Sequence, residues 1–417
     1  MENYRPRVVD AELAQRMTVM GAVMIDGAKA VGKTATASQM AATTVRLDVD
    51  SAARAALKTY PEQLFTHPTP ILFDEWQETP EIWNLVRRAV DDRTRNGLYL
   101  LTGSSRPRDN ARMHSGAGRI GRCRMRPMSL YESGHSSGSI SLAGLLQGDE
   151  PEGKPAPLAV PDLIERVVVG GWPELLENNE SDARVWLTDY MTSLAEIDVP
   201  GLGSRRNPTN IRRLLAALGR HVGSSLNQSA LAQDVGGHQG PVAYETLSNY
   251  LDALERLMLL EPLPAWRPHL RSRTQLRAKS VHHFVDPSLG VAALGGGSSE
   301  LLADLNAAGF HFESLVLRDL RVYAQQLNAT FSSWRDSTTG TEVDAILELP
   351  NGRWAGFEIK LGESGADVAA RSLLTCARKV DATKHGKPTA LVVITGGQYA
   401  YRRPDGVCVV PITALGP

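Results

Sequence analysis

The amino-acid sequence predicts an α/β protein of several domains that begins with a parallel β-sheet. The stretch Gly27–Thr34 fits the phosphate-binding pattern G-x-x-x-x-G-K-[ST] at every fixed position. Apolar strand-like runs alternate with helix-like segments over roughly the first 130 residues. The chain has 417 residues, which is enough for two to four domains with cores of their own.

The phosphate loop reads Gly27-Ala28-Lys29-Ala30-Val31-Gly32-Lys33-Thr34. Glycines allow backbone N–H groups to fold around phosphate oxygens. Lys33 is placed to reach the β- and γ-phosphates, and the Thr34 hydroxyl is placed to ligate Mg²⁺. The preceding stretch Gly21–Asp26 reads as a buried strand, and Thr34–Thr43 reads as the helix whose N-terminus receives the phosphates. We therefore expect ATP and Mg²⁺ as cofactors.

Composition and cysteine spacing argue against several other classes of protein. The 45 Lys and Arg residues balance 46 Asp and Glu residues, so any nucleic-acid surface must be a local patch. The three cysteines are far apart and form no C-x-x-C pair, which argues against a paired-cysteine zinc site and fits a reducing cytoplasm. We expect no signal peptide, because no apolar segment follows the first residues, and no membrane span.

A second nucleotide-site signature follows the loop. Thr69–Asp74 reads as an apolar strand that ends in Asp74 and Glu75. Asp74 would hold Mg²⁺, and Glu75 would polarise the attacking water. After a predicted crossover helix, a further buried strand ends in Thr102 and Ser104. These hydroxyls would sense the γ-phosphate; the alternative is that they only cap the next turn.

Four arginines lie within eight residues at the end of this region, namely Arg119, Arg122, Arg124 and Arg126. An arginine that neutralises transition-state charge on ATP acts either within its own chain or from a neighbouring subunit. Arg119 and Arg122 are the candidates for this arginine finger, and a finger from a neighbour would require a homo-oligomer. The alternative is a solvated basic strand.

These segments together resemble a known family. Its motifs are the phosphate loop, Phe73-Asp74-Glu75, Leu101-Thr102-Gly103-Ser104, Gly118-Arg119-Ile120 and Pro127-Met128-Ser129-Leu130-Tyr131-Glu132. The chain resembles AAA-type ATPases of bacteria and archaea that carry a C-terminal domain of unknown function. The family's usual Pro-Arg-Gln inside the loop is replaced here by Ala28-Lys29-Ala30. The resemblance implies ATPase chemistry and leaves the biological substrate open.

The next part of the chain changes character. Residues 134–161 are rich in Gly, Ser and Pro, which predicts a linker or an exposed loop. From Pro161 to Asp198 the pattern is helical and predicts a lid over the nucleotide. The phrase Gly170-Gly171-Trp172-Pro173-Glu174 is similar to one in the same family, and by chemistry alone it is a helix stop beside a buried Trp.

Residues 207–265 predict a winged helix. Ile211–Val222, Ser229–Val235 and Tyr244–Leu260 have helical periodicity, and Glu261–Trp266 and Ser280–Asp286 read as the strands of the wing. Such units often bind DNA.

The charge of the third predicted helix disfavours contact with phosphate. The helix has three acidic residues, Glu245, Asp252 and Glu255, and only one arginine, Arg256. We therefore favour a structural or protein-docking role for this helix. A basic patch lies instead between the predicted wing strands, at Arg267, Arg271, Arg273, Arg277 and Lys279. It is the best local candidate for nucleic acid, and a solvated loop is the alternative.

The C-terminal region predicts a second α/β domain. A helix at Phe310–Gln326 is followed by a strand, then by a strand with Asp344 and a strand with Glu358 and Lys360. Glu358 and Lys360 alternate onto one face of their strand. This order resembles the core of PD-(D/E)XK nucleases, in which Asp and Glu hold Mg²⁺ and Lys helps the attacking water. The resemblance also implies that Glu313, on the preceding helix, is the accessory acid.

The sequence thus predicts four regions: an AAA-type ATPase domain at 1–133, a linker and helical lid at 134–205, a winged helix at 206–290 and a PD-(D/E)XK nuclease-like domain at 300–417. We expect ATP binding and hydrolysis coupled to DNA binding or metal-dependent DNA cleavage. The alternatives are an ATP-switched module that binds DNA or protein, and a protein remodeller, each with an inactive nuclease-like domain.

Overall fold

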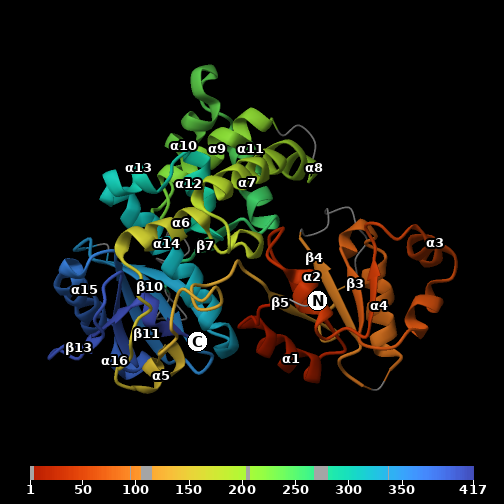
Figure 1. Ribbon diagram of the computed structural model, residues 1–417, viewed down its shortest axis with the longest axis horizontal. Coiled ribbons are helices and arrows are strands. Elements are labelled where there is room, and N and C mark those ends of the chain that lie inside the picture. Colours follow the sequence, from red (N-terminus) through yellow and green to blue (C-terminus); the bar gives the residue numbers. More distant parts are fainter. Residues whose placement is uncertain (1–3, 94, 105–114, 203–206, 267–279, 337) are drawn as a thin grey trace. The chain divides into compact units, whose positions relative to one another are not determined.

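The computed structural model describes residues 4–93, 95–104, 115–202, 207–266, 280–336 and 338–417 (Figure 1). The basic patch at Arg267–Lys279 lies outside these residues. The chain divides into two compact units. The first unit is Met1–Arg126 with the short segment Leu254–Met258, and the second is Pro127–Ala253 with Leu259–Pro417.

The first unit is built on a five-stranded parallel sheet in the order β2-β3-β4-β1-β5. Its strands are β1 (Ala22–Asp26), β2 (Thr43–Arg46), β3 (Ile71–Asp74), β4 (Tyr99–Gly103) and β5 (Ile120–Arg124). Its helices are α1 (Val9–Val19), α2 (Lys33–Ser38), α3 (Ser51–Thr59) and α4 (Ile82–Asp91), with 3₁₀ turns η1 (Pro61–Thr66) and η2 (Trp76–Glu78). The predicted parallel sheet is confirmed.

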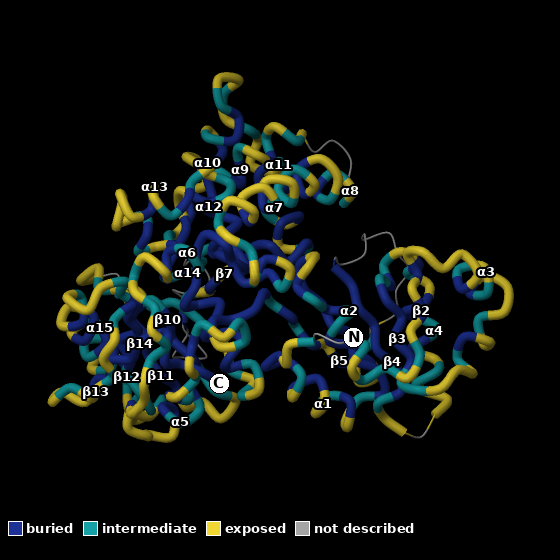
Figure 2. The backbone as a smooth tube through the Cα atoms, viewed as in Figure 1, coloured by how far each residue is buried: buried dark blue, intermediate teal, exposed yellow. Residues whose placement is uncertain are grey.

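Every residue of β1, β3 and β4 is buried, and β3 and β4 are drawn dark blue in Figure 2. Continuous burial is expected of parallel strands that are covered on both faces, and it explains why these strands are unbroken apolar runs. One core cluster joins the strands to the helices, with the Trp76 and Trp83 rings 5.1 Å apart. The sheet is therefore a rigid base for the loops at its carboxyl edge.

The predicted linker at residues 134–161 is wrong in part. This segment contains strand β6 (Ile140–Ser141) and helix α5 (Leu142–Gln147). The strand pairs in parallel with β15 (Leu415–Gly416), close to the end of the sequence, and Ile140 is buried. The Gly- and Ser-rich composition marked local turns correctly, but it gave no sign that a distant strand would pair with this segment.

Helices dominate the next part of the chain. They are α6 (Val160–Val169), α7 (Glu180–Ser193), the π-helical η4 (Leu194–Asp198), α8 (Val199–Gly201), α9 (Pro208–Arg220), α10 (Gln228–Gly236), α11 (Tyr244–Arg256), α12 (Pro287–Leu294) and α13 (Ser298–Ala303). An antiparallel hairpin of β7 (Leu260–Leu263) and β8 (Val281–Phe284) follows α11. The three helices and two strands expected here are present, while the winged-helix assignment and the lid role stay predictions.

The C-terminal part holds a six-stranded mixed sheet in the order β13-β14-β12-β11-β10-β9. Its strands are β9 (Thr330–Arg335), β10 (Glu342–Glu348), β11 (Trp354–Lys360), β12 (Ala390–Thr395), β13 (Tyr401–Arg402) and β14 (Cys408–Pro411). Helix α14 (Leu305–Tyr323) precedes the sheet, α15 (Ala366–Lys379) connects β11 to the parallel β12, and α16 (Ala382–His385) follows α15. The strands β9, β10 and β11 form an antiparallel meander. Among the helices of the described residues, none is long and apolar enough to cross a membrane.

Candidate functional sites

The phosphate loop connects β1, which ends at Asp26, to α2, which begins at Lys33. Two glycines make this path feasible. A Cβ on Gly27 would lie 2.2 Å from the Met125 carbonyl oxygen, so only glycine fits there. Gly32 has a φ of +94°, in the left-handed region that favours glycine. The two fixed glycines of the pattern are thus explained by packing and by backbone conformation.

Lys33 is buried and folded back on the loop. Its Nζ donates hydrogen bonds to the carbonyl oxygens of Gly27, at 3.0 Å, and Ala28, at 2.8 Å. Burial lowers the pKa of Lys33 to about 8, although the carboxylates of Glu75 and Asp74 oppose this shift. Phosphate oxygens would replace the two carbonyls as acceptors and would favour the charged ammonium.

Three predicted residues meet at the carboxyl edge of the parallel sheet. The Thr34 hydroxyl donates to Asp74 Oδ1 at 2.7 Å, and the Thr102 hydroxyl donates to the same oxygen. Ser104, directly after β4, is buried. The Thr34 hydroxyl and the Asp74 carboxylate are oxygen ligands of the kind that Mg²⁺ prefers, and that ion usually keeps water and substrate phosphate as its other ligands. The donor set fits Mg²⁺.

Glu75 follows Asp74 in an uncommon backbone conformation, with a φ of +51°. A non-glycine residue in the left-handed region is rare and is concentrated at functional sites. Its carboxylate accepts a hydrogen bond from the Gln77 side chain. The charge of Glu75 acts to raise the pKa of Lys33, against the effect of burial.

The two candidate finger residues are not part of this cluster. Arg119 Nε donates to Asp91 Oδ1 at 2.8 Å in an exposed ion pair. Arg122 is exposed on β5, where it alternates with buried neighbours. Their outward positions leave the choice between an arginine finger and a solvated strand open.

Two further arginines support the loop, and the sequence analysis assigned neither to it. Arg7, which is buried, donates to the Val31 carbonyl at 3.0 Å and to the Arg126 carbonyl at 2.8 Å. Arg124 lies 3.8 Å from Asp26 at the end of β1. Arg7 precedes the motif by many residues, so no local pattern links it to the loop.

The second unit brings Asp344, Glu358 and Lys360 together. Asp344 lies on β10 and the other two on β11, the antiparallel neighbour. Lys360 Nζ lies 3.4 Å from Asp344 Oδ2 and 2.7 Å from Glu358 Oε2. Asp344 Oδ2 also accepts the backbone N–H of Ile359 at 2.8 Å. We call these three residues, with Glu313 of α14, the acidic cluster.

Charges in the acidic cluster are crowded. Burial, followed by the charge of Asp344, raises the pKa of Glu358 to about 8. Burial and then Asp344 also raise the pKa of Glu313 well above its ordinary value. Burial alone would lower the pKa of Lys360, but Asp344 and Glu358 outweigh it and raise the pKa. One ammonium therefore compensates several carboxylates, and a cation would relieve the remaining repulsion.

The described ranges contain no group of three His, Cys, Asp or Glu side chains arranged closely enough to hold a metal ion by themselves. Asp344 and Glu358 supply two carboxylates. Mg²⁺ is commonly bound by one or two carboxylates, with water and substrate phosphate completing its shell. The cluster therefore fits Mg²⁺ or Mn²⁺ better than an ion that needs a full protein cage.

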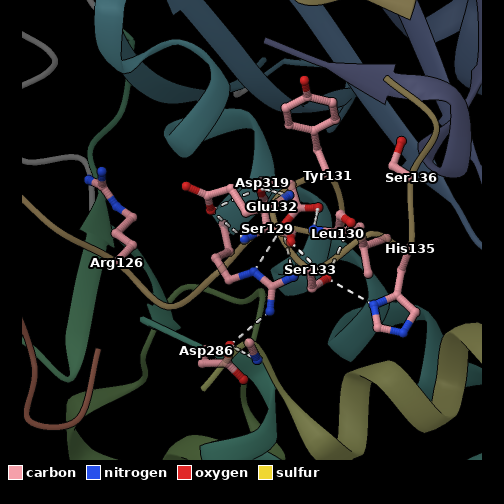
Figure 3. Close-up of polar contacts among 12 residues, drawn as sticks. Arg126, Ser129, Leu130, Tyr131, Glu132, Ser133, His135, Ser136, Asp286 and Asp319 are labelled. Atoms are coloured by element: carbon pink, nitrogen blue, oxygen red, sulfur yellow. Dashed lines mark hydrogen bonds and ion pairs between the residues drawn. The ribbon is translucent and has the colours of Figure 1, made fainter. Parts of the chain in front are cut away.

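Two segments that resemble the AAA-type family in sequence, Pro127–Glu132 and Gly170–Glu174, contact the same buried ion-pair network (Figure 3). Arg318 of α14 bonds Asp319 Oδ1 and Asp286 Oδ2, each at 2.8 Å. Asp319 accepts the backbone N–H of Leu130 at 2.9 Å, and Asp286 accepts that of Gly171 at 3.0 Å. Removing one member would leave buried charge unpaired, so the network fixes residues 129–131 and 170–172 to α14.

Residues 20–134 match the family described as AAA domain. This match includes the phosphate loop and the five-stranded parallel sheet of the first unit. Residues 160–300 and 308–415 match two families that are each described as a domain of unknown function, DUF8612 and DUF4143. The second unit therefore resembles two known families in sequence, and neither family description names an activity.

Two relatives are uncharacterized proteins of Mycobacterium bovis and Mycobacterium tuberculosis. Each is 24% identical over 342 residues, which cover 82% of this chain and 68% of the relative. Among solved structures, a Walker-type ATPase of Pyrococcus abyssi aligns with a TM-score of 0.41 and 12% identity over 70% of this chain and 99% of that one. A mutant of RuvB from Thermotoga maritima aligns with a TM-score of 0.28 and 16% identity over 63% of this chain and 94% of that one.

Proposed function

We propose that this protein binds and hydrolyses ATP with Mg²⁺ in its first unit and cleaves nucleic acid with a divalent cation in its second. The observation that carries the ATPase proposal is the contact between Thr34 and Asp74 beside the buried Lys33. Lys33 binds the β- and γ-phosphates, and the loop N–H groups of Gly27, Ala28, Lys29, Ala30, Val31 and Gly32 surround them. Thr34 and Asp74 hold Mg²⁺.

In this proposal Glu75 orients the attacking water, and Thr102 and Ser104 respond to the γ-phosphate. We expect Glu75→Gln to lower ATP turnover by about 100-fold or more, because general-base catalysis contributes about 10²–10⁴-fold. ATP affinity should stay close to wild type, since the amide keeps the shape of the side chain. Calorimetry and a steady-state phosphate-release assay measure the two quantities.

Glu78→Gln is the matched control, because Glu78 is exposed nearby and should leave turnover unchanged. Equal turnover of Glu75→Gln and wild type would remove Glu75 from the mechanism. A large loss of affinity in Glu75→Gln would instead assign the residue to binding.

We propose Arg119 or Arg122 as an arginine finger supplied by a neighbouring copy of the chain, because Arg122 is exposed on β5 and Arg119 lies in an exposed ion pair with Asp91. Mixing Lys33→Ala with Arg119→Ala, or with Arg122→Ala, should restore part of the turnover, since one kind of interface then combines an intact loop with an intact arginine. Two batches of Lys33→Ala mixed together are the control. Specific activity that does not change on dilution, with no rescue in any mixture, would contradict a finger from a neighbour.

The acidic cluster is the proposed nuclease site. Asp344 and Glu358 hold the cation, which supplies a water of lowered pKa and stabilises charge on the attacked phosphate. Lys360 lies between the two carboxylates, where its ammonium can orient that water or bind a phosphate oxygen. Two observations support a nuclease-like domain. The first is the order of elements: α14, the β9–β11 meander, α15 and the parallel β12. The second is the close approach of Asp344, Glu358 and Lys360.

Coupling between the two sites has a candidate route along the chain. Arg7 joins the phosphate loop to the carbonyl of Arg126, the last residue before the second unit. Shortly afterwards, the backbone of Leu130 is bonded to Asp319 on α14, the helix that carries Glu313. We propose that a nucleotide-dependent shift of the loop is passed along this route to the acidic cluster.

A second candidate function rests on Lys360. Because its ammonium already pairs with both carboxylates, the cluster also suits a nuclease-like domain that binds without cutting. The first unit would then switch a module that binds DNA or protein. A gel shift of DNA that weakens steeply with salt would favour a DNA-binding switch, and no shift would favour a protein partner.

A further inference from the structure

Gln77 lies in a tight turn with Glu75, directly after β3, and the sequence analysis gave it no role. The Glu75 carbonyl oxygen accepts the backbone N–H of Glu78 at 3.0 Å, which closes the turn. Trp76, between Glu75 and Gln77, is 2% exposed and belongs to the core of the first unit. The turn is therefore anchored to the core, and within it the Gln77 side chain bonds the Glu75 carboxylate.

Two neighbours determine which way the Gln77 amide faces. Its Nε2 donates a hydrogen bond to Glu75 Oε2. Its Oε1 lies 2.7 Å from the position that a Cβ on Gly103 would take, and Trp76 Nε1 lies 2.7 Å from the same position. The reversed amide would set Oε1 against a carboxylate and Nε2 near an N–H donor. Both neighbours therefore favour the orientation in which Gln77 donates to Glu75.

The other end of the amide packs against the end of β4. Gly103 is the last residue of that strand, and a side chain there would collide with Gln77 Oε1 and the Trp76 ring. Gln77 Oε1 is buried and, within the part of the chain that the structure describes, accepts no hydrogen bond. A buried unpaired carbonyl costs free energy that an apolar side chain would avoid. The N–H group that reaches Glu75 is the feature that only the amide supplies.

The two carboxylate oxygens of Glu75 have different surroundings. Oε2 accepts the hydrogen bond from Gln77, whereas Oε1 has no hydrogen-bond partner among the described residues. A base that orients an attacking water needs one oxygen open to that water and a side chain that does not rotate, because the reaction depends on close alignment. The arrangement at Glu75 provides both.

We propose that Gln77 is a positioning residue for ATP hydrolysis, whose Nε2–H group holds Glu75 Oε2 so that Oε1 is presented to the attacking water. Gln77 touches neither ATP nor the water and acts through Glu75. An amide suits this role because it donates a hydrogen bond without adding a charge, so that Glu75 keeps its negative charge. The inference rests on the proposed ATPase function and on the role of Glu75 in it.

Gln77→Met in the full-length protein removes the donor and keeps the length of the side chain. We expect ATP turnover at saturating Mg-ATP to fall by about 10- to 100-fold, because a misplacement of about 1 Å costs up to about 100-fold. Affinity for a slowly hydrolysed ATP analogue, measured by calorimetry, should stay close to wild type. Gln63→Met is the matched control, since Gln63 is exposed on η1 of the same unit and should leave both quantities unchanged.

The double variant of Glu75→Gln and Gln77→Met shows whether Gln77 acts through Glu75. If it does, Gln77→Met should lower turnover no further once Glu75→Gln is present. The same fold loss in both backgrounds would show that Gln77 acts independently of Glu75 and would overturn the proposal. If Glu75→Gln loses turnover but Gln77→Met keeps the wild-type rate, only the positioning role fails. If Glu75→Gln keeps the wild-type rate, the proposed role of Glu75 fails, and this inference fails with it.

Gln77→Glu provides a second test in case thermal melts show that Gln77→Met does not fold. It keeps the shape of the side chain and replaces the donor that faces Glu75 with an acceptor of like charge. We expect turnover to fall by about tenfold or more. Wild-type turnover in Gln77→Glu would contradict a hydrogen-bond donor at this position.

Discussion

Replacing Lys33 with alanine is expected to weaken ATP binding about 100-fold and to abolish turnover. The ammonium is the buried cation of the phosphate loop, with two carbonyl acceptors that phosphates would replace. Hydrogen bonds to charged groups contribute about 1.5–3 kcal/mol each, and about 1.4 kcal/mol corresponds to a tenfold change in affinity. Isothermal titration with a slowly hydrolysed ATP analogue measures the change.

Lys58→Ala is a suitable control, because Lys58 is an exposed lysine on α3 of the same unit. It should bind ATP as wild type does. Thermal melts of both variants show whether either substitution unfolds the protein, so that a loss of ATP binding can be assigned to the loop. Wild-type affinity in Lys33→Ala would show that the loop does not bind phosphate.

Replacing Asp344 with asparagine is expected to lower metal-dependent cleavage by about 1,000-fold, because loss of Lewis-acid catalysis costs several kcal/mol. Asparagine keeps an oxygen that can accept the backbone N–H of Ile359, so the strand pairing is preserved. ATP turnover should not change, since Asp344 and the phosphate loop belong to separate units. Rates of cleavage of labelled DNA with Mg²⁺ or Mn²⁺ measure the effect.

Asp367→Asn serves as the matched control. Asp367 is an exposed acid on α15 of the same unit and pairs with Arg403. It should cleave at the wild-type rate. Cleavage by Asp344→Asn at the wild-type rate would exclude the acidic cluster as the catalytic site and would favour a binding role for the second unit.

Local chemistry explains which parts of the fold were predictable. The phosphate loop depends on an apolar strand, two glycines and a helix that begins at Lys33, and all of these lie within a short stretch. The meander that carries Asp344 and Glu358 was also readable, because strand alternation places residues on a face. Contacts between segments that are far apart in the sequence could not be predicted. Ser136 donates to the Leu415 carbonyl at 2.7 Å, and composition could not indicate that contact.

The buried ion-pair network of Arg318, Asp319 and Asp286 could not be predicted from the sequence. Arg318 and Asp319 are adjacent charged residues on a helix, a pattern typical of a solvated face. Both are buried, because Arg318 pairs with Asp319 and with Asp286. Only the tertiary structure shows that these side chains are neighbours.

Cleavage of labelled DNA and RNA by the purified full-length protein, with Mg²⁺ or Mn²⁺ and with or without ATP, is the most direct test of two coupled sites in one chain. We expect cleavage that requires the metal in every case. The rate should change on addition of ATP for wild type and not for Lys33→Ala. Absence of cleavage with either metal on single-stranded DNA, double-stranded DNA and RNA would contradict the nuclease site, and a rate that ATP leaves unchanged would contradict the coupling.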